Sequence, residues 1–379
     1  MKFRVERDVL ADAVAWVARS LPARPPVPVL AGLLLDASPR DGGRLVLSSF
    51  DYEVSARVEV ESDVADAGTA LVSGRLLADI SRSLPNRPVQ VTTDAAKVVL
   101  TCGSSRFTLL TLPVEDYPAL PEMPGASGSL GGDQFATAVG QVAVAAGRDD
   151  TLPVLTGVRV EIEGERIRLV ATDRYRLAVR DLTWTPEQSG LSAVSLVPAR
   201  TLSDTSKALA SADKVTVALA SGSGAEGLIG FEGNGRRTTS RLLDGEYPKY
   251  HTLLQSETSS VATVETAGLI ESVRRVALVA ERNTPVRLSF AGGEVVLEAG
   301  TGDEAQASES LDAALTGEDV SIALNPAYLL DGLGALDATH AELRFTAPTR
   351  PAVIAGKNSV DASAGDDYRY VLMPVRLSR

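Results

Sequence analysis

Three short stretches of the sequence carry residue types that could do chemistry. The run GSGAEG, from Gly222 to Gly227, fits the G-x-G-x-x-G fingerprint in which backbone amides hold a dinucleotide pyrophosphate. Two pairs of adjacent carboxylates, at 149–150 and at 366–367, could bind a metal ion or transfer protons. Each interpretation requires a particular structural setting, which the neighbouring sequence must provide.

The neighbouring sequence does not provide these settings. The fingerprint needs a strand before it and a helix after it, but KVTVALA and LIGFEG both alternate like strands, which predicts a hairpin loop. Neither carboxylate pair has a histidine or a second acidic cluster at motif spacing, so both pairs are predicted to lie in solvated turns. Cys102 is the only cysteine, and His251 and His340 are the only histidines. We therefore expect no disulfide framework, no metal, no cofactor and no catalytic residue.

The composition indicates a globular chain with more than one core. It has 379 residues, 44% of them hydrophobic, which is enough for two or three domains. The net charge of −12 argues against bulk attraction to nucleic acid, although a local basic face stays possible. There is no long apolar run, and the N-terminus MKFRVERDVL is too charged for a signal peptide, so we expect a soluble cytoplasmic protein.

The elements that position these residues occur as three repeats of one unit. PVPVLAGLLLD (26–36) resembles TLPVLTGVRVE (151–161) and, more weakly, NTPVRLSF (283–290). Downstream of these, LSSFDYEVSARV (47–58) resembles LVATDRYRLAVR (169–180), and LEAGTGDEAQAS (297–308) follows in the third copy. Each copy then continues with a helical segment, at 73–85, 197–210 and 324–336. The first two copies begin 151 − 26 = 125 residues apart. A period of this length indicates whole domains in tandem rather than a solenoid.

An acidic residue followed by Tyr-Pro marks the end of the first two repeats. VEDYPAL (114–120) and DGEYPKY (244–250) place their tyrosines 247 − 117 = 130 residues apart. Segments rich in Pro, Gly and Ser follow, at 121–132 and 254–261, and are typical of connectors. The sequence thus predicts three domains, at 1–124, 125–257 and 258–379.

Hydrophobic periodicity predicts the fold class. Apolar residues at helical spacing mark one buried face in the first helix of each repeat: Leu10, Ala13, Val14, Val17 and Leu21; Phe135, Ala138, Val139 and Val142; and Leu269, Val273, Val276 and Ala280. Alternation with period two predicts half-buried strands: Tyr52, Val54, Ala56, Val58 and Val60, and again Tyr175, Leu177 and Val179. Each domain is therefore predicted to be α+β, with two helices packed on antiparallel sheets.

Four motifs carry a family resemblance across the whole chain. ATDRYRLAV (171–179), FTLLTLPVEDYP (107–118), SRLLDGEYP (240–248) and YRYVLMPVRL (368–377) together resemble the bacterial DNA polymerase III beta subunit, the sliding clamp family. The resemblance implies three tandem copies of the DNA clamp fold and a head-to-tail homodimer that closes as a ring around duplex DNA. It implies a non-catalytic processivity factor of DNA replication, acting on DNA without sequence preference. The implied partners are the replicative polymerase alpha subunit, the clamp-loader delta subunit, and other polymerases and repair proteins that carry short linear motifs. No membrane partner is implied, and the expected location is the cytoplasm, at the nucleoid.

The resemblance also suggests three sets of site residues. The expected DNA-facing cations are Arg24, Arg75, Arg82, Arg148, Arg200, Lys207, Arg275 and Arg282. The expected dimer interface joins Phe107 and Leu109 of one copy to Ala277 and Leu278 of the other. The expected peptide-binding cleft comprises Leu155, Thr172, Tyr175, Arg176, Leu177, Pro248, Leu253, Asn325, Tyr328, Met373, Pro374, Val375 and Arg376.

Several positions depart from the family pattern. Many members have Gly-His where this chain has Arg174-Tyr175, which makes that lip of the cleft larger and more polar. Asn283 stands where some relatives have a large apolar residue, and Ser378-Arg379 extend the tail. Peptide preference is therefore expected to differ from that of other members.

Two alternatives to a replicative clamp remain at this point. One is a clamp-like accessory paralogue or interaction scaffold, which a count of clamp-like chains in the genome would address. The other is a dinucleotide-dependent enzyme at Gly222 to Gly227, which a nucleotide-binding titration would separate from a clamp.

Overall fold

The structure is a computed structural model that describes residues 1–38, 43–219, 227–254, 258–280, 284–300 and 305–375. The chain forms two compact units. Unit 1 contains Met1–Phe135, Thr185–Gln188 and Asp204–Leu242, and unit 2 contains Ala136–Trp184, Ser189–Ser203 and Leu243–Arg379.

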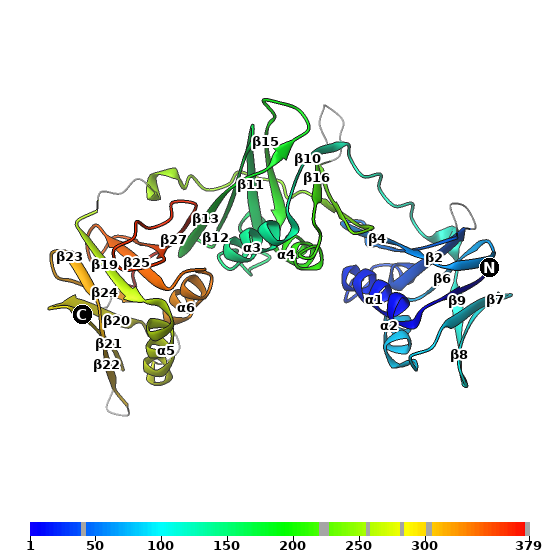
Figure 1. Cartoon of the computed structure of the whole chain (residues 1–379), viewed down its shortest axis with the longest axis horizontal. Helices are drawn as coiled ribbons and strands as arrows, with labels where there is room; N and C mark the ends of the chain where they lie inside the picture. The colour runs from blue at the N-terminus through cyan, green and yellow to red at the C-terminus, as the bar shows by residue number, and fades with distance from the viewer. Residues whose placement is uncertain (39–42, 220–226, 255–257, 281–283, 301–304, 376–379) are drawn as a thin grey trace. The chain divides into compact units, whose positions relative to one another are not determined.

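Six α-helices lie in the described ranges, two for each expected domain. They are α1 (Arg7–Val17), α2 (Gly74–Ser83), α3 (Gly132–Ala143), α4 (Ala199–Ala208), α5 (Thr266–Val276) and α6 (Pro326–Gly334). These helices confirm the predicted helical segments and the predicted order of elements. Each apolar stripe faces inward: Leu10, Val14 and Val17 in α1 are fully buried, as are Leu269 and Val273 in α5. Figure 1 shows α1 beside α2 and α5 beside α6.

Unit 1 is built on one antiparallel sheet of fourteen strands. Their order is β14 (Thr185–Pro186), β10 (Ala126–Leu130), β16 (Val215–Leu219), β17 (Leu228–Gly233), β18 (Arg236–Arg241), β4 (Val54–Glu61), β3 (Arg44–Phe50), β2 (Gly32–Ser38), β6 (Gly68–Ser73), β9 (Ser105–Leu112), β8 (Lys97–Cys102), β7 (Val89–Asp94), β1 (Lys2–Val5) and β5 (Asp63–Asp66). The sheet crosses the expected boundary near residue 124, because β18 pairs with β4 from Arg236↔Val58 to Ser240↔Val54. The main core of this unit lies between the sheet and the helices α1 and α2, and it includes Leu47, Val58 and Leu77.

Unit 2 contains two further antiparallel sheets. The nine-stranded sheet has the order β15 (Ser192–Pro198), β11 (Gly157–Glu163), β12 (Arg166–Thr172), β13 (Arg176–Thr183), β27 (Tyr368–Leu372), β26 (Ala352–Lys357), β25 (His340–Phe345), β19 (Ser260–Glu265) and β23 (Ala314–Gly317). The four-stranded sheet has the order β22 (Ala307–Asp312), β21 (Glu294–Ala299), β20 (Val286–Ala291) and β24 (Val320–Leu324). The nine-stranded sheet crosses the expected boundary near residue 257, since β13 pairs with β27 from Arg176↔Leu372 to Arg180↔Tyr368.

The two Tyr-Pro motifs anchor the chain to strands of the preceding sheet through their tyrosine hydroxyls. The Tyr117 hydroxyl accepts a 2.7 Å hydrogen bond from the Phe50 amide at the end of β3, and the Tyr247 hydroxyl donates a 3.3 Å bond to the Val170 carbonyl in β12. Burial raises the pKa of Tyr117 to about 12, so the phenol stays protonated at neutral pH. Each tyrosine therefore fixes the connector as the chain leaves its repeat.

One detail of the predicted strands is wrong in two repeats. Tyr52 and Tyr175 lie in turns, and the strands that follow begin at Val54 and Arg176. The reason is a side-chain-stabilised turn. Asp51 Oδ1 accepts hydrogen bonds from Glu53 N at 3.0 Å and Val54 N at 2.7 Å, and Asp173 Oδ1 accepts from Tyr175 N and Arg176 N, each at 3.0 Å. Such Asx turns delay the start of the strand, although the alternation in the sequence continues through them.

Within the described ranges, no helix has both the length and the apolar character needed to cross a membrane.

Candidate functional sites

Arg176 is the centre of the expected peptide site. Its side chain is only 4% exposed, although it begins strand β13 and carries a charge. The Arg176 guanidinium donates to Asp173 Oδ2 at 3.0 Å and to Asp331 Oδ2 of α6 at 2.6 Å, and it lies 3.4 Å from the Tyr370 hydroxyl. Burial alone would lower the pKa of Arg176, but Tyr370, Asp331 and Asp173 together raise it above the usual range. Arg176 is thus a permanent cation that links β13 to α6.

Aromatic residues cover one side of this arginine. The Tyr328 ring centroid lies 4.3 Å from the Arg176 guanidinium carbon and 6.4 Å from the centroid of the Tyr175 ring, which is stacked on it. Tyr175 is 58% exposed, so its ring offers an apolar surface to solvent. The Asn325 side chain caps α6 by accepting from Ala327 N at 2.9 Å and Tyr328 N at 3.2 Å. Asn325 therefore acts first as a helix cap.

The C-terminal segment lies beside these residues. The Met373 amide donates to the Tyr175 carbonyl at 2.9 Å, and the Val375 amide donates to the Ala323 carbonyl at 2.8 Å. Met373, Pro374 and Val375 are half-buried. The structure thus brings the predicted tail residues together with Tyr175, whereas Arg376 lies outside the described residues.

Among the remaining peptide-site residues, Leu177 lies on the opposite face of β13 from Arg176. Leu177 alternates with Arg176, and it packs in a small core with Leu253 and Val371. Thr172 of β12 is the cross-strand partner of Leu177, and its hydroxyl donates to the Arg176 carbonyl at 2.6 Å. Pro248 is exposed and Leu155 is buried. The structure gathers Tyr175, Arg176, Tyr328 and the tail closely, and it places Leu177 with Leu253 as a second, apolar group.

The expected DNA-facing cations are exposed, and two pairs lie on helices at matching positions. Arg75 and Arg82 are seven residues apart on α2, and Arg200 and Lys207 repeat that spacing on α4. Residues seven apart share one side of a helix, so each pair forms a short basic stripe. Arg75 donates to the Pro22 carbonyl at 3.1 Å. Three further exposed members are Arg24, Arg148 and Arg275, while Arg282 lies outside the described residues.

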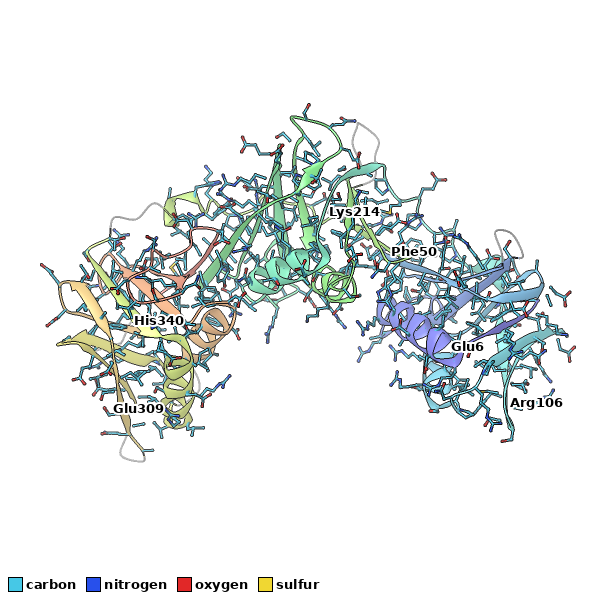
Figure 2. All side chains as sticks on the ribbon, in the orientation of Figure 1. Glu6, Phe50, Arg106, Lys214, Glu309 and His340 are labelled. Carbon is cyan, nitrogen blue, oxygen red and sulfur yellow. The ribbon has the colours of Figure 1, made fainter. Side chains whose placement is uncertain are left out.

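Arg275 differs from the other cations because it has a close acidic partner. It makes two contacts with Glu309 of β22, one of them 3.0 Å from Nε to Oε2, and Figure 2 shows Glu309 beside α5. Hydrogen bonds from Arg275 and Ser272 lower the pKa of Glu309 to about 2. This pairing neutralises much of the charge that Arg275 could offer to a phosphate.

The expected dimer residues lie near two sheet edges. The register of β9 pairs Ser105–Leu110 with β8 alone, whereas Thr111 and Leu112 pair with β6. Phe107 and Leu110 are exposed on this edge, Leu110 by 71%, but Leu109 is buried in the unit 1 core. Leu278, just after α5, is 83% exposed, and Ala277 is half-buried. The Arg275–Glu309 pair holds that end of α5 to β22, which is the terminal strand of its sheet. Leu110 thus takes the exposed position that the sequence interpretation gave to Leu109.

Three family models match consecutive parts of the chain. The N-terminal domain of the DNA polymerase III beta subunit matches residues 1–121, its central domain matches 129–249, and its C-terminal domain matches 251–376. The chain belongs to the DNA polymerase III beta subunit family.

Full-length relatives agree with this assignment. The beta sliding clamp of Streptomyces coelicolor is 66% identical over 379 residues, and the match covers 100% of both chains. The beta sliding clamp homolog GriR of Streptomyces muensis is 49% identical over 380 residues, again covering 100% of both chains. Among solved structures, the DnaN sliding clamp of Pseudomonas aeruginosa bound to griselimycin matches with a TM-score of 0.90 at 27% identity, with 100% of both chains covered.

Membership of the DNA polymerase III beta subunit family establishes the function at a general level. The family supplies the non-catalytic processivity factor of DNA polymerase III, so this chain acts in DNA replication as a sliding clamp and has no catalytic role of its own. A processivity factor works with DNA and a DNA polymerase. The predicted family, fold class and general function are confirmed.

The chemical motifs of the sequence have structural explanations in the clamp fold. Residues 220–226, which hold most of the glycine fingerprint, lie outside the described residues. The flanking strands β16 and β17 pair antiparallel from Thr216↔Glu232 to Leu219↔Ile229, which confirms a hairpin and excludes the helix that a dinucleotide site needs. Asp149 accepts hydrogen bonds from Thr151 N at 3.0 Å and Thr151 Oγ1 at 2.7 Å in an exposed turn. Cys102 is buried, with Sγ 3.2 Å from the Pro85 carbonyl oxygen.

The sequence interpretation missed the partners that hold Arg176 in place. Asp173, Asp331 and Tyr370 each contact its guanidinium, yet none was among the expected site residues. Asp173 could have been found, since an aspartate before a turn residue and a strand is typical of an Asx turn. Asp331 could not, because its contact with β13 joins residues 155 apart in the chain.

Proposed function

We propose that two copies of this chain close head to tail into a ring around duplex DNA. The observation that supports the ring most strongly is exposed apolar surface at two places, Phe107 and Leu110 on the edge of β9 and Leu278 just after α5. Neither unit covers these side chains within the described residues, and an exposed strand edge favours pairing with another chain. A heterologous contact of this kind closes into a ring when the rotation between copies allows it.

The ring prediction is tested by sedimentation velocity. We expect the wild-type chain to sediment as a dimer and Leu278→Asp to shift it toward monomer, because a buried carboxylate in an apolar contact is unfavourable. Val194→Asp is a matched control, since Val194 is an exposed apolar residue on the terminal strand β15. A wild-type chain that stays monomeric, or an equal effect of the control, contradicts the ring.

We propose that the basic stripes on α2 and α4 face the DNA, together with Arg24, Arg148, Arg275 and Arg282. Such contacts reach phosphates rather than base edges, so binding has no sequence preference and weakens with salt. The test is loading onto nicked circular DNA followed by linearisation. A ring stays on the circle and runs off the linear form, whereas retention on the linear form contradicts sliding.

We propose that the surface formed by Tyr175, Arg176, Tyr328 and residues 373–375, together with Arg376, which lies outside the described residues, binds short linear motifs of the replicative polymerase alpha subunit, the clamp-loader delta subunit and other polymerases and repair proteins. Exposed aromatic rings and Met373 offer apolar contacts, and the buried Arg176 supports the Tyr328 ring from below. Leu155, Thr172, Leu177, Pro248, Leu253 and Asn325 complete the proposed site. Tethering a polymerase in this way raises its effective concentration at the primer end.

Deletion of residues 373–379 tests this site. We expect fluorescence anisotropy with a labelled clamp-binding peptide from a replicative polymerase to show a loss of affinity, while sedimentation still shows the dimer. Unchanged peptide affinity refutes the peptide site, and a monomeric truncation places the tail in the ring interface instead.

The finer organisation of the chain is part of the same proposal. We place the domain boundaries near residues 124 and 257, and the protein in the cytoplasm at the nucleoid. A clamp-like paralogue is the second candidate, supported by the 49% identity to a protein named as a clamp homolog. Counting clamp-like chains in the source genome, and depleting this one, distinguishes a replicative clamp from an accessory copy.

A further inference from the structure

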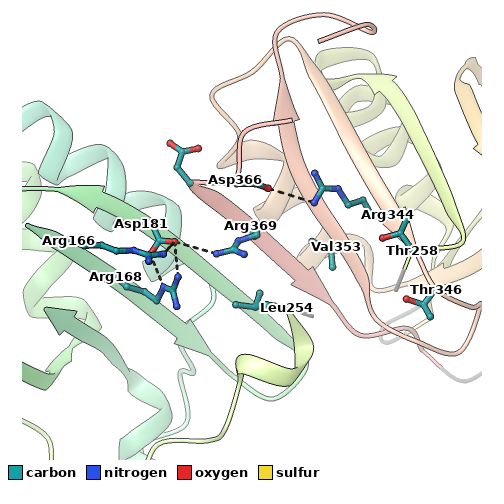
Figure 3. A pocket seen from close by; sticks show the side chains of 11 residues that line it. Arg166, Arg168, Asp181, Leu254, Thr258, Arg344, Thr346, Val353, Asp366 and Arg369 are labelled. Carbon is teal, nitrogen blue, oxygen red and sulfur yellow. Dashed lines mark hydrogen bonds and ion pairs between the residues drawn. The ribbon is translucent and has the colours of Figure 1, made fainter. Parts of the chain in front are cut away.

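A cavity of about 480 Å³ in unit 2 is lined by four arginines, and it is separate from the Arg176 surface. Figure 3 shows Arg166, Arg168 and Arg369 gathered around Asp181, with Arg344 on the other side. The chain as a whole carries a net charge of −12, so a concentration of arginines at one place is unusual for this protein. Such a concentration indicates a local attraction for anions.

Strand register explains why these side chains meet on one face of the nine-stranded sheet. Arg168 pairs with Asp181, Val179 pairs with Arg369, and Arg344 pairs with Val353. Side chains directly opposite one another, or two residues apart on a strand, point to the same face. Arg176 differs from Asp181 by an odd number of positions in β13, so it faces the other side of the sheet. The cavity therefore lies apart from Arg176, on the face of the sheet that carries Leu177 and Val371.

Three guanidinium groups converge on the single carboxylate of Asp181. Arg166 donates to Oδ1 at 3.2 Å and to Oδ2 at 2.6 Å, and Arg168 donates to Oδ1 at 2.7 Å and to Oδ2 at 3.0 Å. Arg369 donates to Oδ2 at 3.3 Å through one nitrogen, and its buried Nε has no partner among the described residues. One negative charge cannot balance three positive charges, so this side of the cavity retains an excess of positive charge.

Carboxylates of the chain itself contact the arginines on both sides of the cavity, which shows that these sides accept a carboxylate group. Asp181 occupies the cluster of three arginines, and Asp366 lies 3.9 Å from Arg344 across the cavity. The Asp366 side chain is 84% exposed, so it can move away and let another carboxylate replace it. Asp367 is already paired with Arg180. Arg344 also binds Glu342 at 2.7 Å, which fixes its orientation.

Apolar residues separate the two cationic sides. Leu254 and Val353 line the cavity, and both pack on the small core that contains Leu177 and Val371. None of the described lining residues is aromatic. A nucleotide usually binds where a base can stack on a ring, so these walls suit an aliphatic side chain better.

We propose that this cavity binds an acidic peptide segment in which carboxylates flank an apolar residue. One carboxylate contacts Arg166 and Arg369, the apolar side chain lies on Leu254 and Val353, and a second carboxylate replaces Asp366 at Arg344. Arginine favours this ligand because its planar N–H groups match a carboxylate in bidentate geometry. The proposal rests on the proposed motif site and extends it toward the arginines, because Leu254 and Val353 pack on the same core as Leu177 and Leu253 of that site.

The test uses the full-length protein and a fluorescein-labelled peptide with two acidic residues on each side of a central leucine. We expect saturable binding by fluorescence anisotropy, and none for the matched peptide with Gln and Asn in place of Glu and Asp. The double variant Arg166→Gln with Arg344→Gln should weaken binding by about tenfold for each arginine removed. Arg350→Gln is the matched control, because Arg350 is exposed in the same domain and does not line the cavity. It should change affinity by less than about twofold.

Several results overturn the proposal. These are the absence of saturable binding and an equal loss with Arg350→Gln. Competition by inorganic phosphate as strong as that by the unlabelled acidic peptide would show a simple anion site instead. If the double variant fails to fold, the single variant Arg166→Gln should still bind the peptide about tenfold more weakly than the wild type. The Arg166 side chain is half exposed, so its replacement is tolerated by the fold.

Discussion

Replacing Arg176 with methionine should destabilise the part of the chain in which β13 and β27 pair. Methionine keeps the length of the side chain but removes the cation that Asp173 and Asp331 now face at 3.0 and 2.6 Å. Asp173 is largely buried, so it would be left with little hydration, whereas Asp331 is 42% exposed and can recover water. Removing one partner of a buried pair costs roughly 3–5 kcal/mol, and the exposure of Asp331 places this variant near the lower end, at about 3 kcal/mol.

Calorimetric thermal unfolding measures this effect. A loss of about 3 kcal/mol in a unit of this size should lower its Tm by roughly 6–12 °C. The Tm of Arg176→Lys should lie between those of Arg176→Met and the wild type, because an ammonium keeps the charge but cannot satisfy two carboxylates in planar geometry.

Arg274→Met is the control for the Arg176 variants. Arg274 is exposed and pairs with Glu271 within one helix at 2.7 Å, so its loss should cost no more than about 0.5 kcal/mol. If Arg176→Met unfolds within 2 °C of the wild type, the assignment of Arg176 as a stabilising link between β13 and α6 is wrong.

Three further predictions follow from single contacts. Arg174 has a φ of 77°, a left-handed conformation that glycine adopts more easily, so Arg174→Gly should stabilise the chain by about 1 kcal/mol in urea unfolding; a loss of stability would contradict this. Tyr117→Phe removes the acceptor of the Phe50 amide and should cost about 1 kcal/mol in the same assay, whereas Tyr52→Phe, at an exposed ring, should cost less. Burial alone would raise the pKa of Asp181, but hydrogen bonds from Arg168 and Arg166 lower it below 3.8. The stabilisation that the ionised Asp181 carboxylate gives is therefore present above about pH 4 and lost as the pH falls below that value. The difference in unfolding free energy between wild type and Asp181→Asn should be constant from about pH 7 to about pH 5 and shrink in more acidic solution. A difference that does not depend on pH would refute this.

The sequence predicts the helices and the repeat well because both depend on local patterns. An apolar stripe such as Leu10, Val14 and Val17 must be buried wherever the helix packs, so the pattern alone defines the face. The turns at Tyr52 and Tyr175 were harder to predict, because alternation continues through them and only the aspartate before each turn signals the break.

The candidate sites are predictable only in part, and for a physical reason. Phe107 and Leu109 both look like strand residues, and only the tertiary packing decides that Leu109 is buried while Leu110 is exposed. The cluster around Asp181 draws arginines from β12 and β27, whose residues are about 200 positions apart in the chain, and periodicity carries no information at that separation. Local pattern thus defines elements, whereas strand register defines sites.

The way the central repeat is shared between the two sheets has a consequence for how the chain can be divided. Its strands β10 and β16 to β18 belong with the first repeat in unit 1, and its strands β11 to β13 and β15 belong with the third repeat in unit 2. The segment that repeats in the sequence is therefore not the segment that packs as a body. An excised central repeat would expose β18 and β13 as open strand edges, each missing the five pairings that it makes in the whole chain. Dissection of this protein into soluble fragments should therefore follow the sheets rather than the repeats.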